Sequence, residues 1–124
     1  MSLEHEELTG KIIAAAIEVH RQLGPGFLES IYESALVIAL HQMGLKVERQ
    51  VEIIVEYAGM EVGRHRLDLL IEGTIIVELK AIKNLVDVHF AIVRSYLKAA
   101  GKQHSLLLNF AKTTLVVKRV IFRY

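Results

Sequence analysis

The sequence predicts an α/β fold in which one mixed β-sheet is flanked by helices. Two helical segments come first, three strand-like segments with short turns follow, and a third helix precedes two last strands. This order, ααβββαββ, differs from the regular alternation of a Rossmann array. The chain has 124 residues, of which 52% are hydrophobic. That size suits one domain with a substantial core, expected to span residues 1–124.

Two helices are expected at the start of the chain. The first spans residues 8–23, where apolar side chains recur with helical spacing, and it ends at Gly24-Pro25-Gly26. The second spans residues 28–43 and stops at Gly44. Its main apolar stripe is expected to consist of Leu28, Ile31, Ala35, Ile38 and Ala39.

The rest of the chain supplies the sheet and one more helix. Strands are expected over residues 47–57 and 60–71, joined at Ala58-Gly59, and a third strand follows the turn at Glu72-Gly73. A helix over residues 86–100 ends at Gly101 and leads to strands over residues 105–110 and 114–122. The first three strands should form an antiparallel meander.

Besides Glu72 in the turn, residues 67–81 carry three charges on the strands of an apolar hairpin, Asp68, Glu78 and Lys80. Because side chains alternate along a strand, Glu78 and Lys80 share one face with Ile76, while the opposite face must be core. A strand this apolar is normally covered on both sides. Buried charges are costly unless they pair or bind a cation, so these residues form a candidate site.

The register of this hairpin decides whether Asp68 and Glu78 meet. A two-residue turn would place the two carboxylates on opposite faces of the sheet. We therefore predict a loop with an odd number of residues, or a bulge. With Ile71, Glu72 and Gly73 as the loop, Asp68 would lie diagonal to Glu78 on one face, and both carboxylates would converge toward Glu29.

Two interpretations of these charges stay open from the residues alone. Paired carboxylates hold Mg²⁺ or Mn²⁺ through oxygen ligands, and a nearby ammonium orients a water or neutralises developing charge. That chemistry hydrolyses phosphodiesters. Alternatively, the charges are solvated strand ends or ion pairs in a structural network, since a Glu-x-Lys triplet is common.

The pattern of Asp68 followed by Glu78-Leu79-Lys80 resembles the PD-(D/E)xK nuclease superfamily. Residues 26–32, GFLESIY, are similar to the motif that names the GxxExxY protein family within it. Further similar segments occur in the expected order, and the resemblance covers residues 9–121. These segments are EVHRQLGPG (18–26), VERQV (47–51), IVELKA (76–81), YLKA (96–99) and LLNF (107–110).

The resemblance implies a restriction-endonuclease-like core and a Mg²⁺- or Mn²⁺-dependent nuclease. Glu29, Asp68 and Glu78 would bind the metal, and Lys80 would act with Asp68 and Glu78 in catalysis. Tyr32, His20 and Tyr96 are candidates for supporting roles around them. Each has a structural alternative: a glutamate in the first helical turn favours the helix dipole, a tyrosine on a helix stripe is often core, and His20 could make only a packing contact.

One position departs from the family pattern. The family usually carries a glutamine on the helix after Glu-x-Lys, facing the metal site, and this chain has Ile92 there. Losing a polar partner of a ligand weakens metal affinity or activity by roughly one to two orders of magnitude. A catalytically weak or inactive module that binds nucleic acid or protein is therefore the alternative function.

Nucleic acid is the partner that the resemblance implies, with DNA favoured over RNA. The net charge is only +1, so any phosphate-binding surface must be local. Basic residues that would contact phosphates if they cluster are Lys46, Arg49, Arg64, Arg66, Lys83, Arg94, Lys98 and Lys102.

The composition also suggests a partner subunit and a compartment. A mean hydropathy of +0.37 predicts a homodimer that covers apolar surface, placed on the last strand at Leu115 and Val117 or at Val120 and Phe122. The absence of cysteine fits a reducing cytoplasm. The apolar runs are too short to span a membrane, and the acidic residues 1–7 do not resemble a secretory signal.

Overall fold

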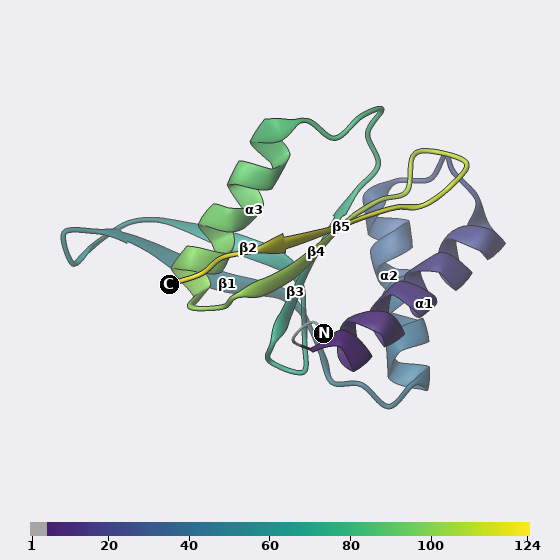
Figure 1. Cartoon of the computed structure of the whole chain (residues 1–124), viewed down its shortest axis with the longest axis horizontal. Coiled ribbons are helices and arrows are strands. Elements are labelled where there is room, and N and C mark those ends of the chain that lie inside the picture. The colour runs from purple at the N-terminus through teal and green to yellow at the C-terminus, as the bar shows by residue number, and fades with distance from the viewer. Residues whose placement is uncertain (1–4) are drawn as a thin grey trace.

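The computed structural model describes residues 5–124, so residues 1–4, which begin the expected domain and its acidic N-terminal segment, lie outside the described residues. A five-stranded sheet in the order β1-β2-β3-β4-β5 forms the centre of the fold. Helices α1 (Glu6–Leu23) and α2 (Glu29–Gln42) pack on one face of this sheet. Helix α3 (Asp87–Ala100) packs on the other face (Figure 1).

The sheet is mixed, as predicted. Its strands are β1 (Val47–Tyr57), β2 (Met60–Ile71), β3 (Ile75–Lys80), β4 (His104–Asn109) and β5 (Val116–Ile121). Neighbouring strands are antiparallel except for β3 and β4, which are parallel. A parallel pair needs a long crossover, and α3 provides it.

Alternation along β3 divides its side chains between two hydrophobic clusters. Ile75, Val77 and Leu79 pack against α1 and α2. Ile76 packs on the opposite side with Val93 and Leu97 of α3. The prediction that the odd-numbered residues form a core face, with the sheet covered on both sides, is therefore confirmed.

The predicted apolar stripe of α2 is wrong for its three large residues, and only Ala35 and Ala39 pack against the core. The helix buries Tyr32, Leu36, Val37 and Leu40, whereas Leu28, Ile31 and Ile38 are exposed. Apolar residues occur almost all the way around this helix, so their spacing does not select one face. Packing against the sheet selects the face that carries the tyrosine.

The apolar residues of the last strand are not free for a partner. Leu115 and Val117 pack against the α1–α2 cluster, Val120 is buried on the α3 side, and Phe122 packs beside it. These four side chains therefore belong to the two hydrophobic clusters on opposite faces of the sheet, although Ile121 of β5 stays exposed. Among residues 5–124, no helix combines the length and the apolar character that a membrane span requires.

Candidate active site

The β2–β3 hairpin has the odd loop that the site requires. Its register pairs Leu69 with Val77 and Ile71 with Ile75, which leaves a three-residue loop of Glu72, Gly73 and Thr74. Glu72 and Gly73 have positive φ values of 53° and 62°. The odd loop was predicted correctly, but it starts one residue later than expected. Continuing this register places Asp68 opposite Glu78 rather than diagonal to it.

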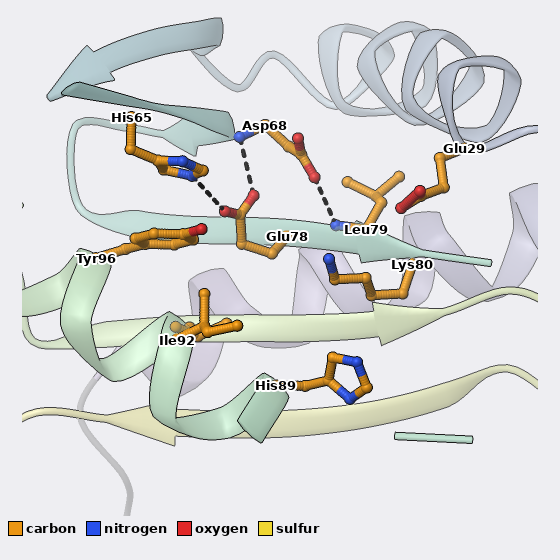
Figure 2. A pocket seen from close by; sticks show the side chains of 10 residues that line it. Glu29, His65, Asp68, Glu78, Leu79, Lys80, His89, Ile92 and Tyr96 are labelled. Carbon is orange, nitrogen blue, oxygen red and sulfur yellow. Dashed lines mark hydrogen bonds and ion pairs between the residues drawn. The ribbon is translucent and has the colours of Figure 1, made fainter. Parts of the chain in front are cut away.

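The side chains of Asp68 and Glu78 continue the hydrogen bonding between β2 and β3 beyond the end of the backbone ladder. Beyond the Leu69–Val77 pair, the Asp68 N–H donates to Glu78 Oε2 at 2.9 Å. The Leu79 N–H donates to Asp68 Oδ2, also at 2.9 Å (Figure 2). The two carboxylates therefore hold the strands together through a reciprocal pair of side-chain contacts.

These carboxylates open into a pocket of about 250 Å³ between the sheet and α3. The pocket brings together the predicted site residues Glu29, Asp68, Glu78, Lys80 and Tyr96. Ile92 also lines it, as expected for the position where the family carries glutamine. Figure 2 shows the Lys80 ammonium and the Glu29 carboxylate directed toward the same space beside Asp68.

Glu78 is the most buried charge of the pocket, with 5% of its surface exposed. Burial raises the pKa of its carboxyl to about 9, and the charge of Asp68 contributes to that rise, while Lys80 acts to lower it. Partial burial also raises the pKa of Glu29, where Lys80 again lowers it and Asp68 raises it. The electrostatics therefore favour uptake of positive charge, either a proton or a metal ion.

The motif residues Gly26, Glu29 and Tyr32 have distinct structural roles. Gly26 has φ 111°, which L side chains rarely adopt, and Glu29 opens α2 at the edge of the pocket. Tyr32 lies outside the pocket, where its hydroxyl donates to Gly24 O at 2.6 Å and accepts the Phe27 N–H at 3.1 Å. Tyr32 thus closes the loop that presents Glu29.

Two further contacts fix this part of the chain. The Tyr32 ring stacks on Phe110 with centroids 4.5 Å apart. Glu33, one residue later, is buried and accepts from Arg49 Nη2 and Gln50 Nε2 of β1, both at 2.9 Å. The start of α2 is therefore attached to the sheet independently of any ligand.

His20 does not join the pocket. Its Nε2 lies 2.8 Å from Lys112 O and 3.2 Å from Phe110 O, so its ring links α1 to the segment after β4. The structure supports the packing alternative for His20. His20 follows Val19 near the end of α1, just before the Gly-Pro-Gly break, and from there its side chain reaches the segment after β4.

Several basic residues expected at a phosphate surface are already paired or face elsewhere. Arg49 is bound to Glu33, and Arg64 pairs with Glu52 at 2.6 Å and Glu61 at 3.1 Å. Helical geometry places Arg94 and Lys98 about half a turn around α3 from Tyr96. Of the lysine and arginine side chains in residues 5–124, Lys80 is the one that lines the pocket.

The structure adds two histidines that the sequence pattern did not indicate. His65 Nε2 lies 3.5 Å from Glu78 Oε1, and its ring stacks on Tyr96 with centroids 3.6 Å apart (Figure 2). Burial lowers the pKa of His65, against the charge of Asp68, while Lys80 also lowers it. His89 lines the pocket and accepts the Val86 N–H at 2.9 Å through Nδ1.

The two histidines differ in how they could have been found. His89, Ile92 and Tyr96 follow helical spacing, so the helix pattern does place His89 on the pocket side. His65 and Asp68 are three residues apart on one strand, which simple alternation puts on opposite faces. Leu67 and Leu70 nevertheless both pack on the α3 side. That break in alternation brings His65 to the site.

The donor set fits a divalent cation, although its side chains are not gathered as a finished metal cage. Within residues 5–124, no three His, Cys, Asp or Glu side chains are placed so that they could already hold an ion. Asp68 and Glu78 nevertheless offer hard oxygen ligands from adjacent strands, and Glu29 lines the same pocket. Burial and the charge of Asp68 raise the pKa of Glu78, and a bound cation would favour its ionised form instead.

Comparisons with known proteins agree with this geometry. A family model described as the PD-(D/E)XK nuclease superfamily matches residues 6–120. A solved structure described as "Crystal structure of SSO0001" superposes with a TM-score of 0.62 at 15% sequence identity. The match covers 97% of this chain and 60% of that one, so this chain spans less than two thirds of its length. No curated protein matches the sequence.

Proposed function

The chain belongs to the PD-(D/E)XK nuclease superfamily, and from this membership we propose that it is a Mg²⁺- or Mn²⁺-dependent nuclease acting on nucleic-acid phosphodiesters. One observation carries the proposal. Asp68 and Glu78 meet across the end of the β2–β3 ladder, and Lys80 lines the same pocket. This is the arrangement of two acids and a lysine that the superfamily motif describes.

Each polar residue of the pocket has a role in the proposed reaction. Glu29, Asp68 and Glu78 would hold the cation. When bound, the cation polarises the scissile phosphate and lowers the pKa of a water. The Lys80 ammonium orients the attacking water and balances the negative charge that develops on the phosphate. The Leu79 side chain packs in the core on the opposite face of the sheet. This packing fixes the backbone at Leu79 and therefore the positions of its neighbours Glu78 and Lys80.

Three narrower features of the proposal concern the family, the substrate and the oligomeric state. The arrangement of Gly26, Glu29 and Tyr32 around the start of α2 supports assignment to the GxxExxY family. DNA is proposed as the preferred substrate over RNA, by family resemblance. A homodimer is proposed because apolar side chains remain exposed on the outer side of α2, including Leu28, Ile31 and Ile38.

A cleavage screen tests the nuclease directly. The purified chain is incubated with single-stranded, duplex and branched DNA and with RNA, with Mg²⁺, Mn²⁺ or EDTA. We expect cleavage that needs the metal and is lost in Lys80→Ala. The matched control is Lys11→Ala, since Lys11 pairs with Glu7 on the surface of α1. Equal cleavage by the Lys80→Ala protein would contradict the proposal.

Ile92 favours a second candidate function, a module that binds nucleic acid or protein without cutting it. Its side chain lines the pocket where a polar partner of the ligands would be expected. Such a module would bind nucleic acid in the same screen and leave it intact under every metal condition. Binding without cleavage therefore separates it from the nuclease.

A further inference from the structure

His65 carries a polar atom that the described residues leave without a partner. Its Nε2 is buried and makes no hydrogen bond within residues 5–124, although the side chain as a whole is 32% exposed. The nearest charged group is Glu78 Oε1 at 3.5 Å, which is longer than an ordinary N–H···O hydrogen bond of roughly 2.7–3.2 Å. Leaving such an atom unpaired costs free energy, so its placement needs a reason.

The separation matches two ligands of one metal ion. With metal–nitrogen and metal–oxygen bonds of about 2.1 Å, two ligands at a tetrahedral angle lie about 3.4 Å apart, and at a right angle about 3.0 Å apart. His65 Nε2 and Glu78 Oε1, at 3.5 Å, are close to the first value. Two groups that share an ion are expected at this spacing, whereas two groups that share a hydrogen bond are expected to be closer.

The imidazole is also held in place before any ion arrives. It stacks on the Tyr96 ring at a centroid distance of 3.6 Å and an interplanar angle of 13°. Tyr96 lies on α3 and His65 lies on β2, so the stack joins the two walls of the pocket. A ligand whose ring is fixed by packing loses little freedom when it binds.

We propose that His65 Nε2 is a ligand to the divalent cation, alongside Glu78 and Asp68. This inference rests on the metal site of the proposed function and adds a nitrogen donor to its oxygen donors. The ligand set is not preassembled. Asp68 accepts the Leu79 N–H through Oδ2, so it would bind the ion through its other carboxylate oxygen. The imidazole binds as the neutral ring with its proton on Nδ1.

A nitrogen donor changes which ion the pocket prefers. Oxygen-only sites suit Mg²⁺, whereas imidazole favours later first-row transition metals. The pocket should therefore prefer Co²⁺ and Mn²⁺ to Mg²⁺, and His65 should be the cause of that preference. Ile92 on the facing helix contributes no donor, whereas His65 places a ring nitrogen 3.5 Å from Glu78 Oε1.

The test compares metal affinities rather than cleavage. Co²⁺, Mn²⁺ and Mg²⁺ are each titrated by calorimetry into the wild-type chain and into His65→Phe, which keeps an aromatic ring against Tyr96 but has no nitrogen. We expect His65→Phe to lower Co²⁺ affinity by at least about tenfold and to change Mg²⁺ affinity by less than about threefold. The visible absorption of bound Co²⁺ should change in parallel. His41→Ala is the control, since His41 is exposed on α2.

The outcomes separate this inference from the metal site itself. If Asp68→Ala weakens all three metals but His65→Phe leaves the Co²⁺ to Mg²⁺ ratio unchanged, His65 is only an ion-pair partner of Glu78 and the inference is overturned. If Asp68→Ala leaves every affinity unchanged, the metal site of the proposed function fails as well. His65→Gln, which keeps a polar side chain but has no imidazole nitrogen, provides the same comparison if the phenylalanine variant does not fold.

Discussion

The carboxylates of Asp68 and Glu78 each accept a hydrogen bond from a backbone N–H of the other's strand, with both donor–acceptor distances at 2.9 Å. The pair that forms the candidate site therefore also closes the hairpin where its backbone ladder stops. Changing either acid removes a hydrogen-bond acceptor from a backbone amide as well as a charge. Variants of these residues should be tested for stability and for metal binding in the same preparation.

Removing the first acid should weaken metal binding. We expect Asp68→Ala to lower Mn²⁺ affinity by at least about tenfold, or about 1.4 kcal/mol, because one oxygen donor is lost. Calorimetry measures the affinity, and Asp68→Asn serves as a comparison that keeps an acceptor for the Leu79 N–H. Unchanged Mn²⁺ affinity in Asp68→Ala would rule out a metal site at this pair.

Stability without metal should fall as the pH rises, because of Glu78. Its pKa in the folded chain is about 9, above its ordinary value of 4.5, so the folded chain binds the extra proton between these values. The stabilisation is complete below about pH 4.5 and is lost as the pH rises through about 9. The slope from this group is at most about 1.4 kcal/mol per pH unit.

Urea unfolding in EDTA at several pH values between about 5 and about 9 measures this effect. Glu78→Gln is the matched variant, since glutamine keeps the shape of the side chain and does not titrate. The wild type should lose stability relative to Glu78→Gln as the pH increases, and saturating Mn²⁺ should reduce that loss. Parallel pH profiles for the two proteins would show that Glu78 does not carry the proton.

Tyr32 should stabilise the loop before Glu29 through its hydroxyl. Tyr32→Phe leaves the Gly24 carbonyl and the Phe27 N–H without this partner, while the stack on Phe110 remains. We expect the free energy of unfolding to fall by about 1–3 kcal/mol and metal affinity to fall with it. Tyr57→Phe is the control because Tyr57 is 77% exposed. Equal stability of the two variants would contradict this role.

The strands and the hairpin parity follow from local chemistry that the sequence displays. Turn residues bound β1 and β2 at Val47–Tyr57 and Met60–Ile71, and alternation separates Ile75 from Ile76. The buried face of α2 does not follow, because apolar residues surround that helix and only packing chooses among them. The position of the loop was missed by one residue, since both Glu72 and Gly73 take positive φ.

The residues of the candidate site also divide into those that the sequence indicates and those that it does not. Asp68, Glu78 and Lys80 stand close together in the sequence, so strand alternation and a short motif indicate them. Glu29 needed a resemblance, because the rest of α2, the whole of β1 and the first part of β2 lie between it and Asp68. His65 was missed because alternation breaks between Leu67 and Leu70, and no pattern in the sequence marks that break.

The exposed side of α2 should mediate a homodimer. Leu28, Ile31 and Ile38 are 73%, 41% and 59% exposed, and they lie along one side of the helix. Light scattering at micromolar concentration should give twice the 14.0 kDa chain mass, and Ile38→Lys should shift the protein toward monomer. Val62→Lys, at an equally exposed site on β2, should leave the mass unchanged. A monomeric wild type would refute the dimer.

Restoring a polar group at position 92 should strengthen the site. Ile92 lines the pocket and is 40% exposed, so Ile92→Gln places an amide near the carboxylates without removing a core side chain. A polar partner that orients metal ligands contributes about 10- to 100-fold in affinity or activity, and we expect Mn²⁺ affinity or cleavage to rise by at least about tenfold. The change in stability should stay within about 0.5 kcal/mol, as for other surface substitutions.

Val88→Gln is the control, because it also replaces an apolar side chain of α3 with glutamine but lies outside the pocket. Val88 is 55% exposed, and the substitution should have no effect on metal binding. Should Ile92→Gln and Val88→Gln behave alike in both measurements, the isoleucine is not what limits this site.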